Sequence, residues 1–168
     1  VSGSGYEPKG EFRSNGQSIV PGQRSALLRL LQIGVLCNDA SLESYDGNWI
    51  IKGDPTEGAL ITAGAKAGLD AESMATSWPR VGEIPFSSER MRMTTIHQTP
   101  EGPMALSKGA VEIVLASCNR VYSAGAEKDL TPADRTQVAE ANKNMGGGGL
   151  RVLAAAYKPL SEASQDPE

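Results

Sequence analysis

Few residues that support metal or thiol chemistry occur in this sequence. Among its 168 residues there are two cysteines and one histidine. Cys37 and Cys118 form no CxxC pair and lie far apart, which fits buried thiols in a reducing compartment better than a disulfide framework or a zinc site. Because His97 is the single histidine, a histidine-based metal site and a Ser-His-Asp triad both have little to draw on.

Long apolar runs and an excess of basic charge are also missing. No stretch of about 18 apolar residues occurs, so the sequence predicts no membrane-spanning segment and no direct membrane contact. The formal net charge of −4 argues against a general nucleic-acid binder, because a domain that neutralises many phosphates is basic. Any anionic ligand must therefore be held by a few placed cations.

What is present is the composition of an ordinary globular domain. Hydrophobic residues make up 39% and charged residues 21% of the chain, and its length suffices for one domain with a sizeable core. The chain opens without Met and without a signal-peptide pattern. We therefore expect a fragment of a larger protein, with one domain over residues 1–160 and a disordered tail over 161–168.

Apolar periodicity and turn chemistry divide the chain into helices and strands. Leu27, Leu30, Leu31, Gly34 and Val35 follow the spacing of one helical face, which predicts a helix over 24–37. The other expected elements are a strand at 49–51, a helix from 55 to about 67, strands at 80–86, 91–98 and 104–107, a helix at 111–117, a helix from 132 to about 144 that the glycines at 146–149 end, and a final buried strand at 150–157. The predicted fold class is α/β (α+β), an antiparallel β-sheet flanked by helices in two layers.

The stretch Lys52–Leu60 joins a strand to a helix and concentrates charge. Asp54 stands where a helix N-cap belongs, and Glu57 follows three residues later, as in a capping box. Pro55 suits the first helical position. Helix capping alone explains these residues, and a functional role stays an open alternative on their spacing.

Further polar or aromatic residues stand where predicted strands begin or end. Lys108 follows a strand and is backed by Gly109, which lets a ligand approach the backbone beside an ammonium group; a solvated lysine before a turn is the simpler interpretation. Phe86 ends a strand, where it either packs in the core or stacks on a flat base. Arg151 enters an otherwise apolar strand, so it needs an acidic partner or an anionic ligand.

Four stretches together resemble, in order and approximate spacing, the signature segments of one family. That family is the nucleotide-binding domain of P-type cation-transporting ATPases, and the similarity is closest to the calcium-transporting and related type II pumps. The four stretches are Lys52–Leu60, Phe86–Met93, Ser107–Ala110 and Gly149–Leu153. The connecting segments Gly3–Tyr6 and Leu36–Ala40 also look like that family, so the resemblance covers nearly the whole chain.

The resemblance implies an ATP site, with roles that follow from the family. Phe86 would stack on the adenine ring, and Lys108 would line the inner end of the adenine pocket with Gly109 allowing close approach. Glu57 would lie near the adenine amino group, and Arg151 would reach towards the phosphates. The residues implied to contact ATP are Asp54, Thr56, Glu57, Phe86, Ser88, Arg90, Lys108, Gly109, Arg151 and Leu153.

The same resemblance implies the cofactor, the partners and the location. ATP would be bound, as Mg-ATP in the parent enzyme, and the phosphorylation and actuator domains of the same parent chain would be its partners. The segment would be a cytoplasmic domain of an integral membrane protein that moves cations, calcium being favoured. The family's Asp-Lys-Thr-Gly-Thr stretch, which carries the phosphorylated aspartate, does not occur here. We therefore expect ATP binding without hydrolysis by this segment itself.

The sequence departs from the family pattern at two places, and the first of them, Met91, favours a second interpretation. Met91 stands where the family commonly has a lysine that helps to hold the nucleotide, and Gly146–Gly149 stands where more varied residues are usual. Met91 and Met93 alternate with Arg92, so we expect them to share one face of their strand as packing residues. The alternative is a non-catalytic α/β interaction domain, without physiological nucleotide binding, whose polar motifs are capping and salt-bridge structure.

Overall fold

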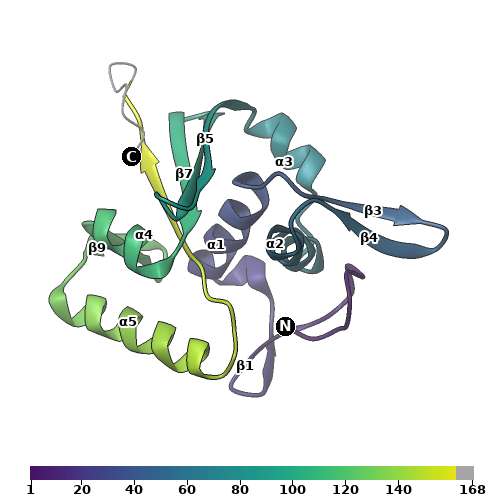
Figure 1. Ribbon diagram of the computed structural model, residues 1–168, viewed down its shortest axis with the longest axis horizontal. Coiled ribbons are helices and arrows are strands. Elements are labelled where there is room, and N and C mark those ends of the chain that lie inside the picture. Colours follow the sequence, from purple (N-terminus) through teal and green to yellow (C-terminus); the bar gives the residue numbers. More distant parts are fainter. Residues whose placement is uncertain (162–168) are drawn as a thin grey trace. The chain divides into compact units, whose positions relative to one another are not determined.

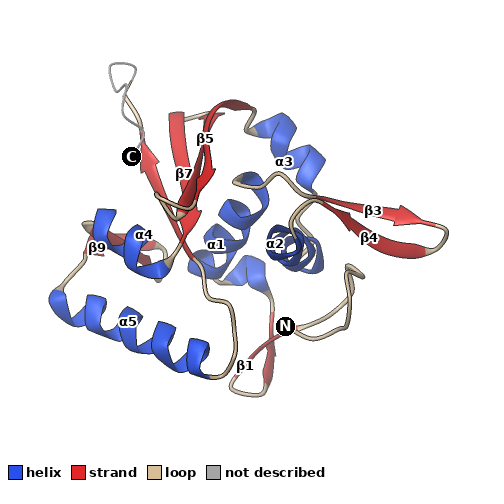
Figure 2. Cartoon of the chain, in the orientation of Figure 1, coloured by secondary structure: helices blue, strands red, loops and turns tan. Residues whose placement is uncertain are grey.

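The computed structural model describes residues 1–161 and divides the chain into two compact units, residues 1–79 and a second unit that begins at Arg80. Both units mix helices with antiparallel strands (Figures 1 and 2), so the predicted fold class is confirmed. The expectation that residues 1–160 act as one domain stays a prediction. Residues 162–168 of the expected tail lie outside the described residues.

The first unit is built on two packed helices, α1 and α2 (Figure 1). Its elements are β1 (Phe12–Ser14), β2 (Gln17–Ile19), a 3-10 helix (Pro21–Gln23), α1 (Ser25–Leu36), β3 (Ser41–Tyr45), β4 (Asn48–Lys52), α2 (Pro55–Lys66) and α3 (Ala71–Ser77). α1 confirms the helix predicted from the leucine spacing, and its second half is buried at Leu31, Gly34 and Val35. Leu30, predicted on the same face, is 49% exposed.

β3 and β4 form a two-stranded hairpin that leads into α2. The central turn residues Asp46 and Gly47 have φ angles of 50° and 77°, as a type I′ turn requires. The strand predicted at 49–51 is thus the second half of a hairpin. Its partner β3 has no apolar run that would reveal it in the sequence, and it is a strand because its backbone pairs with β4, Leu42 opposite Ile51.

The second unit contains a four-stranded antiparallel sheet with two helices. Its elements are β5 (Arg80–Ser87), β6 (Arg92–Thr99), β7 (Gly102–Gly109), α4 (Val111–Ser117), β8 (Arg120–Ser123), β9 (Ala126–Asp129), α5 (Pro132–Gly147) and β10 (Ala154–Pro159). The strand order is β10-β7-β6-β5, so β5, β6 and β7 pair in chain order as a meander, and the predicted antiparallel sheet is confirmed. α4 contacts β7, β10 and α5, and Figure 2 shows the two helices side by side.

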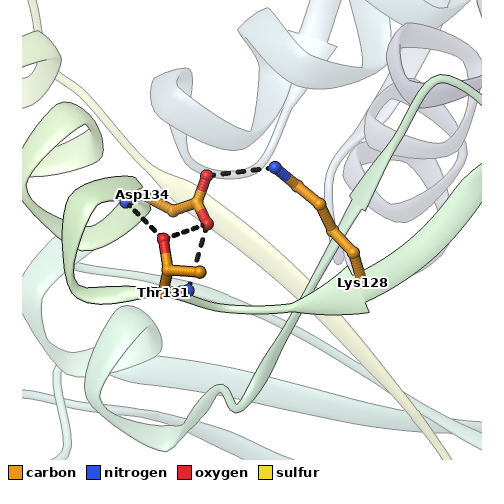
Figure 3. Close-up of polar contacts among 3 residues, drawn as sticks. All are labelled: Lys128, Thr131 and Asp134. Carbon is orange, nitrogen blue, oxygen red and sulfur yellow. Dashed lines mark hydrogen bonds and ion pairs between the residues drawn. The ribbon is translucent and has the colours of Figure 1, made fainter.

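α5 begins at Pro132, as predicted, and Thr131 is its N-cap. Thr131 Oγ1 accepts a hydrogen bond from Asp134 N at 3.2 Å, and Asp134 Oδ2 accepts one from Thr131 N at 3.0 Å, which completes a capping box. Lys128 of β9 adds an ion pair of 3.1 Å to Asp134 (Figure 3). The Thr131 hydroxyl, the Thr131 backbone and Lys128 together lower the pKa of Asp134 to about 2.

Two predictions near the C-terminal end of this unit are wrong. α5 continues through Gly146 and Gly147 and does not end near Asn144, because glycine lowers helix stability without blocking the helical backbone. β10 begins at Ala154 and not at Leu150. Residues 150–153 connect α5 to the first position that pairs with β7.

Candidate functional site

One end of the four-stranded sheet collects residues from all four strands. Ser87 of β5 pairs with Arg92 of β6, Arg92 pairs with Gly109 of β7, and Gly109 pairs with Ala154 of β10. We call these four residues the end row. Paired residues of neighbouring strands lie about 5 Å apart, so the segments around the end row meet at this end of the sheet. Seven predicted site residues stand within three positions of the end row in sequence: Phe86, Ser88, Arg90, Lys108, Gly109, Arg151 and Leu153.

Phe86 stands at an irregular point of β5. The register against β6 shifts between Ile84 and Ser87, which leaves Phe86 outside the regular pairing. Its side chain is 58% exposed, so its ring is not buried in the core. An aromatic ring with this exposure at the end of a sheet can stack on a planar ligand.

The turn between β5 and β6 is held by contacts of Arg90 and Met91. Arg90 Nη1 donates to Pro85 O at 2.9 Å, and Arg90 N donates to Ser87 Oγ at 3.2 Å. Met91 N donates to Ser87 O at 2.7 Å. The guanidinium of Arg90 therefore lies against the backbone that carries Phe86, while Ser88 is exposed in the turn.

Met91 lies in this turn, with a φ of 51°, and not in β6 as the sequence predicts. It consequently shares no strand face with Met93: Met91 is 46% exposed and Met93 only 3%. Met91 O accepts a hydrogen bond from Ala110 N at 2.9 Å. The same carbonyl passes so close to Gly109 that a Cβ there would lie 2.4 Å from it. The close approach of the chain's own backbone therefore accounts for Gly109 without any ligand.

Lys108 is buried, with 7% of its surface exposed, so the simpler interpretation of a solvated lysine is wrong. It pairs with Met93 on one side and with Ala155 on the other, and directly paired residues share a face of the sheet. The ammonium group thus belongs to a largely apolar face close to the end row. In such surroundings its attraction for an anion is stronger than it would be in water.

Arg151 and Leu153 belong to the connection between α5 and β10. Arg151 is exposed and lies outside the strand, so the prediction that it enters an apolar strand is wrong, and its exposure removes the need for an acidic partner or an anionic ligand that such a strand would impose. Its position three residues before Ala154 still brings it to the approach of the end row. Leu153, directly before Ala154, is half-buried.

Positive charge predominates around the end row. The segments 86–92, 107–110 and 150–154 contain one acidic residue, Glu89, and four cations: Arg90, Arg92, Lys108 and Arg151. The whole chain carries a net charge of −4. The cations expected for an anionic ligand are therefore concentrated at this end of the sheet.

The remaining three predicted site residues lie in the first unit, at the start of α2. Asp54 is the N-cap, as predicted, because its Oδ1 accepts from Thr56 N at 2.7 Å and from Glu57 N at 3.2 Å. Glu57 Oε2 accepts from Asp39 N at 3.3 Å, and Asn38 Nδ2 donates to Glu57 O at 3.1 Å. In the sequence, Asn38 and Asp39 stand in the connecting segment Leu36–Ala40. Their contact with Glu57 spans 18 or 19 residues, so no local pattern reveals it.

Within residues 1–161, no group of three or more His, Cys, Asp or Glu side chains is placed to hold a metal ion. Cys37 and Cys118 form no disulfide, and burial raises the pKa of the Cys118 thiol. None of the helices in this described part of the chain has the length and apolar character needed to cross a membrane.

Comparison with known proteins identifies the family. Residues 26–168 match the family model described as P-type ATPase, cytoplasmic domain N. The chain belongs to this family. The resemblance of the four sequence stretches is thereby confirmed, and the family description agrees with the predicted cytoplasmic location.

The relatives of this N domain are named as calcium- or cation-transporting ATPases. A calcium-transporting ATPase of Bacillus subtilis (strain 168) is 33% identical over 168 residues, which cover 99% of this chain and 19% of the relative. A probable cation-transporting ATPase F of Mycobacterium tuberculosis is 42% identical over 155 residues, 92% of this chain and 17% of the relative. Calcium-transporting ATPase type 2C member 1 of Bos taurus is 36% identical over 163 residues, which cover 95% of this chain and 16% of the relative. The N domain spans about a fifth or less of these relatives.

Proposed function

We propose that this P-type ATPase N domain binds ATP by its adenine end and presents the γ-phosphate to the phosphorylation domain of a cation-transporting pump. The observation that carries the proposal is the convergence of exposed Phe86, buried Lys108 and Arg151 at one positively charged end of a sheet. Relatives named calcium-transporting ATPases favour calcium as the transported ion. The phosphorylation and actuator domains of the parent chain are the proposed partners.

The three residues that carry this proposal have non-covalent roles. Phe86 stacks on the adenine ring, and Lys108 lines the inner end of the adenine pocket. Arg151 reaches the phosphates of Mg-ATP, the substrate. One stack and a few charge-assisted hydrogen bonds of about 1.5–3 kcal/mol each must offset the cost of fixing the ligand, so we expect weak binding. The contribution to phosphoryl transfer is positioning.

Glu57 is proposed to recognise the adenine amino group, with Asp54 and Thr56 orienting its loop. Capping of α2 depends on the Asp54 carboxylate and not on that of Glu57. Glu57→Gln should therefore leave the free energy of unfolding nearly unchanged and weaken ATP binding. If Glu57→Gln left ATP affinity unchanged, Lys52–Leu60 would have only a structural role as the start of α2.

An NMR titration with ATP tests the proposal directly. The amide signals of Phe86, Lys108 and Gly109 should shift, and Phe86→Ala should weaken ATP and adenosine binding alike by the stacking free energy of about 1–3 kcal/mol. Tyr45→Ala is the matched control, because Tyr45 is an aromatic residue with 74% exposure in the first unit. If saturating nucleotide moved none of these signals, the binding proposal would fail.

The second candidate is a non-catalytic interaction domain. Met91 favours it, because a half-exposed thioether in this turn occupies the position where the family commonly has a lysine. A chain that showed no ATP-dependent shifts would support this candidate. Under either proposal the purified segment should not hydrolyse ATP, and steady phosphate release by the purified 168-residue chain would contradict both.

A further inference from the structure

The C-terminal end of α5 closes with a helix cap centred on Gly149. Leu150 N donates to Met145 O at 3.2 Å, and Gly149 N donates to Gly146 O at 2.9 Å. These are the two bonds of a Schellman motif. Gly149 has a φ of 78°, a left-handed conformation that a Cβ would crowd. Arg151 follows two residues later.

The connection that carries Arg151 runs between two fixed points. Downstream, Ala154 pairs with Gly109 at the end row. Upstream, α5 donates three side-chain hydrogen bonds to α4 and the residue after it: Arg135 to Leu115 O (2.7 Å) and Cys118 O (2.5 Å), and Asn142 to Glu112 Oε1 (2.7 Å). The backbone direction at Gly149 therefore decides where the short bridge of residues 150–153 carries the guanidinium.

Little packing reinforces this cap. Its apolar pair, Met145 and Leu150, is 43% and 62% exposed. Gly146 and Gly147 occupy the last turn of α5, where glycine disfavours the helix, and no atom lies within 4 Å of a Cβ built at either position. The geometry of the cap thus depends on its two backbone hydrogen bonds and on the left-handed conformation of Gly149.

We propose that Gly149 is a positioning residue for Arg151. Its left-handed conformation directs the chain out of α5 so that the Arg151 guanidinium meets the phosphate end of a nucleotide bound at the end row. The inference rests on the proposed function, because it assigns a device that serves the same ATP site. It predicts that Gly149 matters for the phosphates and not for the adenosine part.

The test measures ATP and adenosine affinity for wild type, Gly149→Ala, Arg151→Met and the double variant. Gly149→Ala should weaken ATP binding about five-fold, the factor that corresponds to the strain of a left-handed alanine, and should leave adenosine binding unchanged. In the Arg151→Met background, Gly149→Ala should have no further effect on ATP affinity, since coupled residues are non-additive. Gly149→Asn should restore ATP affinity, because asparagine tolerates this conformation.

Gly16→Ala is the matched control: Gly16 has a φ of 80°, nothing lies within 4 Å of its Cβ, and it belongs to the first unit. It should leave ATP affinity unchanged. Three results would each overturn the positioning role. Gly149→Ala could leave ATP affinity unchanged, or it could lower ATP affinity equally with Arg151 present and with Arg151→Met. It could also lower adenosine affinity as much as ATP affinity. Failure of the proposed function itself is distinguishable, because wild type would then show no nucleotide-dependent shift at Phe86.

Discussion

Replacing Gly109 with alanine tests why a glycine follows Lys108. An ideal Cβ at this position would lie 2.4 Å from Met91 O, 2.6 Å from Arg92 Cβ and 2.7 Å from Arg92 Cα. Two of these three atoms belong to the backbone, so a methyl group fits only if the turn at Met91 or the pairing of β6 with β7 moves. The end row would be disturbed in either case.

The expected loss of stability follows from this overlap. Overpacking costs about 1–3 kcal/mol and sometimes more, and we expect the upper value, about 3 kcal/mol, because backbone must shift. Each kcal/mol lowers the Tm of a chain of this size by about 2–4 °C, so Gly109→Ala should unfold about 6–12 °C below wild type. Thermal and urea unfolding followed by circular dichroism measure this difference. Gly146→Ala is the matched control, since its Cβ meets nothing within 4 Å.

One result would refute the packing explanation. If Gly109→Ala unfolded at the wild-type midpoint and yet bound ATP more weakly, the glycine would serve the approach of a ligand, as the sequence alone suggests. The contact between the Met91 carbonyl and residue 109 would then be wrong.

Three further predictions concern local backbone and charge. Gly146→Ala and Gly147→Ala should each stabilise the chain by up to about 1 kcal/mol, seen as a higher urea midpoint; a lower midpoint would contradict the helical end of α5. Ala124 has a φ of 51°, so Ala124→Asn should stabilise by up to about 1 kcal/mol, and a loss of stability in the same assay would show that this turn is misplaced. The folded pKa of Asp134, about 2, lies below its ordinary value of 3.8, so its stabilisation is present above pH 4 and is lost as the pH falls towards 2. Asp134→Asn should flatten the pH dependence of unfolding over that interval, and an unchanged slope would count against the capping box.

Much of the fold follows from short-range chemistry that the sequence displays. The cap at Asp54, the Thr131-Pro132 helix start and the helix at 111–117 depend on residues within four positions of one another, so their structure is evident before any tertiary contact. The order and spacing of the four family stretches likewise identified the P-type ATPase N domain. The helix starts require only local agreement between neighbouring residues, and the family resemblance requires only the order of stretches along the chain.

Other features were decided by strand pairing between distant segments. β3 is a strand because it pairs with β4. Met91 lies outside β6 because its backbone N–H and C=O form hydrogen bonds with Ser87 O and Ala110 N in the turn. The convergence of Phe86, Lys108 and Arg151 depends on the register of β10, β7, β6 and β5. By itself, the sequence determined the family, the helix starts and which residues were candidates. Only the tertiary structure decided which candidates share the end row, because a one-residue change of register would turn each side chain to the other face of the sheet.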